Sequence, residues 1–124
     1  FSLTEEQKML KTMVQDFATK ELEPIAAQID EESRFPAESI KKMAELGLTG
    51  LGLPEEYGGS GGGATELCIA IEEISRVCAS TSTILLASTG LGGEPLSAYG
   101  TEEQKKTLSN SCSHRRKVSR ICPD

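Results

Sequence analysis

Apolar residues recur at helical spacing near the start of the chain. Leu10, Val14 and Phe17 fall on one face of a helix. The TEEQ sequence before them is typical of a helix N-terminus, with Thr4 as the N-cap residue and the Gln7 side chain reaching back to it. The two glutamates between them would face the positive end of the helix dipole. These features predict a helix start at this point.

The same reasoning predicts helices over four segments, residues 4–32, 37–46, 65–78 and 81–97. Pro24 is expected to break or restart the first helix because proline has no N–H to donate. Gly47 is expected to cap the second helix, and Ser80 or Thr81 the fourth. A second TEEQ sequence, at Thr101, predicts a last short helix. No segment alternates between apolar and polar residues for long enough to predict a strand, so the predicted fold class is all-α.

Residues 47–63 hold eight glycines and are predicted to be a loop. Within it, Gly59, Gly61 and Ala64 satisfy G-x-G-x-x-A, a permitted form of the dinucleotide-binding fingerprint. A nucleotide loop needs a strand that leads directly into the glycines and an acid about 20 residues further on, and neither is present. Two glutamates just before Gly59 would also repel a diphosphate. The residues therefore favour a connector between two helices over a nucleotide loop.

Net charge is −6 for the whole chain and is unevenly distributed. Residues 111–124 carry four basic residues and one acidic residue, a net charge of +3, so the first 110 residues carry −9. An acidic body argues against nucleic-acid binding, because phosphate backbones are bound by clustered cations. No apolar run is long enough to span a bilayer, and no signal peptide is recognisable. The chain begins at Phe1, so a targeting segment removed upstream stays open.

Four cysteines are too few and too scattered for a disulfide framework. Cys68 and Cys78 lie in a helical pattern and are interpreted as small buried hydrophobes, which fits a reducing compartment. Cys112, His114 and Cys122 form a Cys/His cluster, but a zinc site needs four ligands at recognisable spacing. No metal site is therefore predicted.

Glu72, Glu73 and Arg76 could be taken for a catalytic acid pair beside a cation. Positions 72 and 76 are i,i+4 neighbours on a helix, which favours a surface ion pair. Catalytic carboxylates need burial to shift their pKa, and the apolar face of this helix, with Ile71 and Ile74, points the other way. The sequence predicts a surface pair without a catalytic role.

Four sequence segments occur in an order that is specific to one enzyme family. LTEEQKML, LGLTGLGLPEEYGGSG, AIEEISRVCAS and YGTEEQKK together resemble the N-terminal helical domain of the acyl-CoA dehydrogenases, most closely the short-chain (butyryl-CoA) branch. The resemblance covers residues 2–107 without an obvious gap, and residues 1–107 are assigned to this domain. Residues 108–124 diverge from the family pattern into a basic tail that is expected to be disordered and to bind neither nucleic acid nor lipid.

The resemblance implies an oxidoreductase that binds FAD and converts a short- or medium-chain acyl-CoA to a trans-2-enoyl-CoA in fatty-acid or branched-chain amino-acid breakdown. It implies a homotetramer that passes electrons to an electron-transferring flavoprotein, in the bacterial cytoplasm or the mitochondrial matrix. In the family, a middle β-domain and a C-terminal helical domain follow, and they supply most of the flavin site and a glutamate base. Neither is expected in these 124 residues. This chain alone is therefore expected to bind no FAD, to be inactive and to self-associate.

The resemblance also implies one place where substrate would touch this domain. The family helix that corresponds to residues 80–96 lines the acyl-chain pocket, and an ungapped match places Ile84, Leu85, Ser88 and Thr89 nearest the chain. The alternative is that the two apolar residues are core and that the two hydroxyls bond their own helix backbone. A second function class also stays open: a helical interaction module without enzymatic activity. Flavin bound to the purified protein would favour the enzyme.

Overall fold

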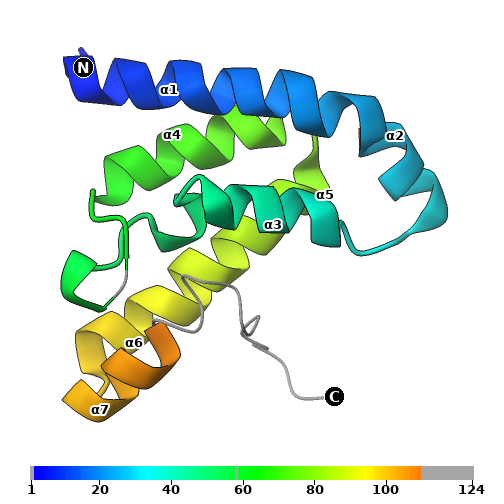
Figure 1. The fold of residues 1–124 in the computed structure, drawn as a ribbon. Helices are drawn as coiled ribbons and strands as arrows, with labels where there is room; N and C mark the ends of the chain where they lie inside the picture. The colour runs from blue at the N-terminus through cyan, green and yellow to red at the C-terminus, as the bar shows by residue number, and fades with distance from the viewer. Residues whose placement is uncertain (1, 58, 110–124) are drawn as a thin grey trace.

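The computed structural model describes residues 2–57 and 59–109, and helices dominate them (Figure 1). The α-helices are α1 (Glu5–Phe17), α2 (Glu23–Glu32), α3 (Ala37–Glu45), α4 (Ala64–Ser75), α5 (Ala79–Leu86), α6 (Glu94–Tyr99) and α7 (Glu102–Gln104). Three π-helical segments, Ala18–Leu22, Ala87–Gly93 and Lys105–Ser109, and two 3₁₀ turns, Leu48–Gly50 and Glu55–Tyr57, complete the order. Extended pairing among the described residues is one isolated bridge between Leu51 and Gly61. The all-α prediction is confirmed.

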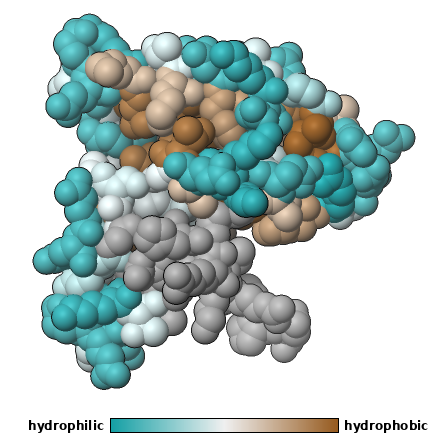
Figure 2. Space-filling model, in the orientation of Figure 1, coloured by the Kyte–Doolittle hydropathy of each residue, from teal (hydrophilic) through white to brown (hydrophobic). Residues whose placement is uncertain are grey.

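The core forms where α1, α3, α4 and α5 meet (Figure 1). The apolar positions that recur at helical spacing supply it, with Val14 from α1, Met43 from α3, Ile74 from α4 and Leu85 from α5 all at most 1 % exposed. Burial of each such side chain stabilises the fold by roughly 1.5–3 kcal/mol relative to leaving it in water. The same packing leaves apolar side chains visible between α1 and α3 on one face of the molecule (Figure 2).

The sequence predicts that the first helix breaks or restarts at Pro24. In the structure the helix continues past Pro24, and its turns widen just before that residue. The π-helical segment Ala18–Leu22 joins α1 to α2, and Pro24 is the second residue of α2. A proline ring clashes with the carbonyl four residues earlier and donates no hydrogen bond to it, and a π turn opens the backbone ladder at that point. The second π-helical segment, Ala87–Gly93, stands in the same relation to Pro95 in α6. Residues 5–32 are therefore helical throughout.

The start of α1 is hydrogen-bonded to the start of α4. Thr4 and Gln7 form the predicted capping box, with the Gln7 N–H donating to Thr4 Oγ1 at 3.2 Å and the Thr4 N–H donating to Gln7 Oε1 at 3.0 Å. The same Gln7 side chain donates through Nε2 to Glu66 Oε1 at 3.1 Å. Glu66 Oε2 in turn accepts from the Gly63 N–H at 2.8 Å. One glutamine and one glutamate thus cap two helices and link them.

This linkage makes part of the stability depend on pH. The hydrogen bond from Gln7, then the backbone N–H groups at Glu66 and Gly63, lower the pKa of Glu66 from its ordinary value of 4.5. Stability from a lowered carboxyl pKa is present above 4.5 and is lost as the pH falls through the folded-state pKa. We expect the wild-type chain to melt at a higher temperature than Glu66→Gln at pH 7, and the difference to shrink below pH 4.5 in melts followed by circular dichroism. Glu72→Gln, on the exposed side of the same helix, should leave the melting temperature at pH 7 unchanged; a constant difference down to pH 3 would contradict the linkage.

Two cap predictions have different outcomes. Gly47 ends α3 in the left-handed conformation, φ 76°, as expected for a residue just past a helix end. The prediction of Ser80 or Thr81 as the cap of α5 is wrong, because the helix begins at Ala79 with Cys78 in the N-cap position. The Thr81 hydroxyl lies 3.1 Å from Cys78 Sγ inside the first turn. It makes a local hydrogen bond there and does not mark the helix boundary.

Candidate functional site

An apolar pocket of about 250 Å³ lies between α4 and the end of α5. Most of its lining residues are apolar or glycine, and one free thiol, one hydroxyl and one carboxylate join them. The residues that line it from these helices and the π-helical segment are Leu67, Cys68, Ile71, Leu86, Thr89, Gly90 and Glu94. The loop before α4 and the first residue of that helix close one side, with Leu51, Gly52, Gly63 and Ala64.

Residues 77–93 position the pocket wall and contain no charged side chain. Within this segment Leu85 is 1 % exposed and belongs to the core, whereas its neighbour Leu86 is 41 % exposed and faces the pocket. Leu91, 59 % exposed, follows in the π-helical segment. A helical segment without charge that has leucines both in the core and on the exposed side is typical of an element buried between two bodies.

The four predicted substrate residues are not all in one place. Thr89 lines the apolar pocket, although it is buried and its hydroxyl donates to the Leu85 carbonyl at 2.7 Å. Ile84 lines a shallower hollow with residues that include Ser33 and Phe35. Leu85 packs in the core, and Ser88 is half-buried.

Sequence reasoning did not select Leu86, Gly90 or the α4 residues of the pocket. Leu86 stands in the apolar run of the same helix, but nothing in the run separates a core leucine from its neighbour at the pocket. That distinction depends on the angle at which α5 packs on α4, which the sequence pattern does not define.

The glycine-rich loop is a connector, and most of the backbone donors among its described residues are already in use. The Gly59 N–H donates to the Pro54 carbonyl, and the Ser60 N–H donates to the Gly50 carbonyl. The Gly52 N–H donates to the Gly61 carbonyl at 2.9 Å, and the Gly61 N–H donates to the Leu53 carbonyl at 3.0 Å. A diphosphate on such a loop would need several of these N–H groups free. The structure supports the connector interpretation of residues 47–63.

Tyr57 holds the tip of this loop against α7. Its hydroxyl donates to Glu102 Oε2 at 2.6 Å, and Lys105 Nζ lies 5.9 Å from the centre of its ring. The hydrogen bond to the Glu102 carboxylate, which needs the phenol proton, raises the pKa of Tyr57 to about 12. Stability from a raised pKa is present below the ordinary value of 10.0 and is lost as the pH rises through about 12.

An absorbance titration of tyrosinate would test this contact. The chain has two tyrosines, so a Tyr99→Phe background isolates Tyr57. We expect a midpoint of about 12 in that background and a midpoint closer to 10.0 when Glu102→Gln is added. Helical circular dichroism recorded over the same pH range would show that the fold persists, and a folded protein with a midpoint at 10.0 in the background variant would contradict the hydrogen bond.

The predicted surface ion pair between Glu72 and Arg76 is wrong, because Arg76 pairs with Glu73, whose side chain is buried. Glu73 is 5 % exposed, and its Oε2 lies 3.5 Å from Arg76 Nε, whereas its Oε1 lies 3.6 Å from Lys11 Nζ on α1. The ion pair is therefore i,i+3 and extends across two helices. The apolar face of α4 is wider than the sequence suggested, because α1 covers the edge on which Glu73 lies.

The remaining chemical predictions concern cysteines, metals and membranes. Cys78 is buried as predicted, but Cys68 is exposed at the pocket, so its assignment to the core is wrong. No cluster of three metal-ligating side chains occurs among residues 2–57 and 59–109. The Cys112, His114 and Cys122 cluster lies outside the described residues. Within the described part of the chain, no helix combines the length and the apolar character that a membrane crossing requires.

Comparisons with known proteins agree with this architecture. Residues 4–113 match the family described as "Acyl-CoA dehydrogenase, N-terminal domain". The short-chain specific acyl-CoA dehydrogenase of Clostridium acetobutylicum is 48 % identical over 106 residues, which are 86 % of this chain and 28 % of that protein. The mitochondrial short-chain specific acyl-CoA dehydrogenase of Bos taurus is 50 % identical over 104 residues, 84 % of this chain and 25 % of that protein. A solved acyl-CoA dehydrogenase complexed with FAD from Bacillus anthracis superposes with a TM-score of 0.87 at 30 % identity, over 95 % of this chain and 21 % of that one.

The fold and the pocket thus define an all-α domain with an apolar pocket between α4 and the end of α5. The chain belongs to the acyl-CoA dehydrogenase family, and the part of the family that it matches is the N-terminal domain. It spans about a quarter of the length of the curated relatives it matches.

Proposed function

We propose that this chain is the N-terminal helical part of an FAD-dependent acyl-CoA dehydrogenase that oxidises a short- or medium-chain acyl-CoA to a trans-2-enoyl-CoA. The observation that carries the proposal is the match of residues 4–113 to the family, with relatives whose names specify short-chain acyl-CoA. Residues 108–124 would be a divergent basic tail. A homotetrameric enzyme in the bacterial cytoplasm or mitochondrial matrix, with an electron-transferring flavoprotein as acceptor, is part of the proposal.

The apolar pocket is the place where this domain would contact substrate. A saturated acyl chain needs an uncharged, mostly apolar wall, and residues 77–93 supply one. Thr89, Leu86 and Gly90 lie on this wall in the structure. Ile84, Leu85 and Ser88, which the family resemblance also indicates, would contact the chain only if α5 shifted on joining the rest of the enzyme.

The residues of this chain do not fit the diphosphate of FAD on their own. The glycine-rich loop uses most of its described N–H groups internally, and Glu55 and Glu56 lie within it. No oxidation step is therefore assigned to this chain. Proton removal from the substrate and the main flavin contacts would come from residues outside these 124, and the chain alone would be inactive and free of flavin.

A chimera tests the proposal directly. Residues 1–107 would replace the matching part of the Clostridium acetobutylicum enzyme, and the isolated chain would be purified in parallel. We expect the chimera to bind flavin and reduce a dye with butyryl-CoA, and the isolated chain to do neither and to self-associate. A chimera that folds and binds flavin without oxidising any acyl-CoA would instead support a helical module without enzymatic activity.

The pocket assignment has its own test in the same chimera. Leu86→Trp should reduce activity on longer acyl-CoAs more than on butyryl-CoA, because the indole would fill space at the pocket wall. Leu91→Trp is the matched control, an exposed leucine five residues further on that does not line the pocket. An identical chain-length profile in both variants and the parent would mean that the acyl chain lies elsewhere.

A further inference from the structure

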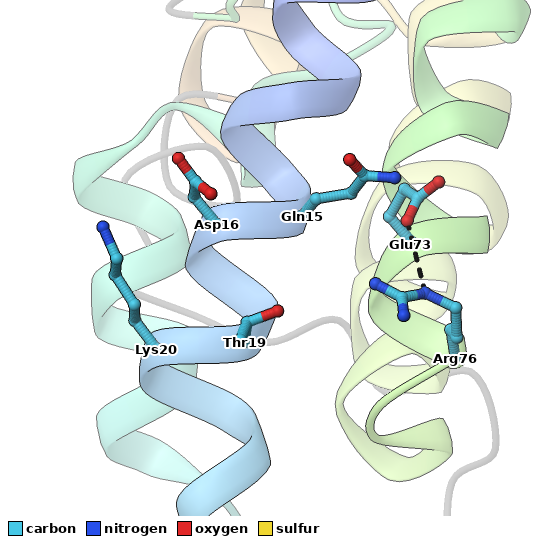
Figure 3. A pocket seen from close by; sticks show the side chains of 6 residues that line it. All are labelled: Gln15, Asp16, Thr19, Lys20, Glu73 and Arg76. Carbon is cyan, nitrogen blue, oxygen red and sulfur yellow. Dashed lines mark ion pairs between the residues drawn. The ribbon is translucent and has the colours of Figure 1, made fainter.

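A polar groove lies between α1 and α4, apart from the apolar pocket, and it encloses about 570 Å³. Figure 3 shows Gln15 and Thr19 pointing from the first helix toward α4, where Glu73 and Arg76 face them. The other lining residues, Asp16 and Lys20, extend from the opposite side of the first helix (Figure 3).

Arg76 presents most of its guanidinium to this groove. Its Nε lies 3.5 Å from Glu73 Oε2, and 59 % of its side chain is exposed. The two terminal nitrogens make no hydrogen bond with the described residues. A guanidinium carries five N–H donors in a fixed planar fork. One edge of the fork is therefore held toward Glu73, and the other edge is free to bind a ligand.

Glu73 orients Arg76 without contributing an optimal ion pair. Its carboxylate is 93 % buried, yet Oε2 has no hydrogen-bond partner among the described residues. Both cations beside it, Lys11 and Arg76, stand beyond ordinary hydrogen-bond distance, at 3.6 and 3.5 Å. Desolvation of a carboxylate with so few bonds costs about as much as the pairing returns. Stability alone does not account for a charge in this position, whereas fixing the direction of the Arg76 fork does.

One polar side chain of the first helix faces the free edge of the fork. The Thr19 hydroxyl points toward it, whereas the Gln15 amide ends beside Glu73, and neither side chain is hydrogen-bonded to the described residues (Figure 3). The two carboxylates at the groove, Asp16 and Glu73, are balanced by Lys20 and Arg76, and Lys11 beside Glu73 adds one positive charge. A planar cationic fork with a hydroxyl beside it matches an oxyanion, which accepts two parallel hydrogen bonds from guanidinium.

We propose that the groove between α1 and α4 binds an oxyanion, a carboxylate or a phosphate group, through the fork of Arg76, with Thr19 as a supporting donor and Glu73 as the positioning residue. The groove is open and larger than a lone ion needs, so the group would be carried by a larger molecule. This site is independent of the function proposed above, since neither the acyl pocket nor the flavin takes part.

The test is an NMR titration of the full 124-residue chain with sodium phosphate and, separately, with sodium acetate, at an ionic strength kept constant with chloride. We expect saturable shifts of the Arg76 Nε–H and of the amides near Thr19 with at least one of the two anions. Saturation with acetate alone assigns a carboxylate ligand, and saturation with phosphate assigns a phosphate group. Thermal melts at low protein concentration with the same anions give a second measurement if the chain self-associates.

Arg76→Lys keeps the charge and removes the fork, and it should weaken the affinity about tenfold, the loss of one charge-assisted hydrogen bond. Thr19→Val should weaken it less. Arg34→Lys is the control, because Arg34 is also paired with carboxylates, those of Glu32 and Glu38, and lies outside the groove. Chemical-shift changes that increase linearly with the concentration of both anions would overturn the proposal. So would an Arg76→Lys variant that binds the anion as tightly as the parent.

Discussion

Gly59→Ala is expected to lower the free energy of unfolding by about 3 kcal/mol. A Cβ at this position would lie 2.2 Å from the Leu53 carbonyl oxygen and 2.5 Å from its carbonyl carbon. These are backbone atoms, and Leu53 is itself buried and hydrogen-bonded through that carbonyl to the Gly61 N–H. The clash could be relieved only by opening the loop. Chemical denaturation of the two proteins, followed by circular dichroism, measures the loss.

Gly63→Ala provides the matched control in the same loop. Its Cβ would meet the nearest atom, Glu66 Oε2, at 3.5 Å, an ordinary contact, and its φ of −136° suits any residue. Glycine is preferred over alanine at an N-cap, so this substitution is expected to cost roughly 0.5–1 kcal/mol, well below the loss expected for Gly59→Ala. Equal losses for the two variants would mean that glycine content in general, and not the close approach to Leu53, stabilises the loop.

Leu85→Ala is expected to destabilise the chain by about 3 kcal/mol, and Leu86→Ala by less than about 1 kcal/mol. The two side chains are identical and adjacent, but Leu85 is 1 % exposed in the core and Leu86 is 41 % exposed. Removing the buried side chain leaves a cavity, whereas removing the exposed one mainly enlarges the pocket. Denaturation of both variants under the same conditions measures the difference.

The pair also separates structure from substrate contact. In the chimeric enzyme, Leu86→Ala should alter the acyl-chain profile while leaving the melting temperature close to that of the parent. If Leu86→Ala proves the more destabilising of the two, then α5 is rotated relative to the arrangement described above, and Leu85 is the pocket residue.

Local signals in the sequence predicted the local structure well. The TEEQ sequences at Thr4 and Thr101 both form capping boxes, because the two hydrogen bonds involve residues only three positions apart. Gly47 takes the left-handed conformation at a helix end for an equally local reason. The all-α class followed from the 3.6-residue period, since a helix meets its hydrogen-bonding needs within one segment.

Features that depend on packing were harder to predict. The burial of Glu73 follows from the angle at which α1 packs on α4. Cys68 is exposed because none of the described helices packs over that position of α4. Both residues lie on a helix whose apolar face was correctly located but whose width was not. The candidate site shows the same limit, because the wall that includes Thr89 and Leu86 is formed by a helix–helix contact that no short stretch of sequence encodes.

The two Glu-Pro sequences have a consequence for how this chain tolerates insertions and deletions. Each follows a π-helical segment, Ala18–Leu22 before Pro24 and Ala87–Gly93 before Pro95. A π turn holds about one residue more than an α turn, and one residue advances a helix by roughly 100°. Deleting one residue from either segment would restore regular α geometry and rotate everything beyond it by about that angle, so that the buried Ile29 of α2, or the half-buried Leu96 of α6, would leave its present contacts. The same deletion in the loop of residues 47–63 would shorten a connector and leave the phase of every helix unchanged.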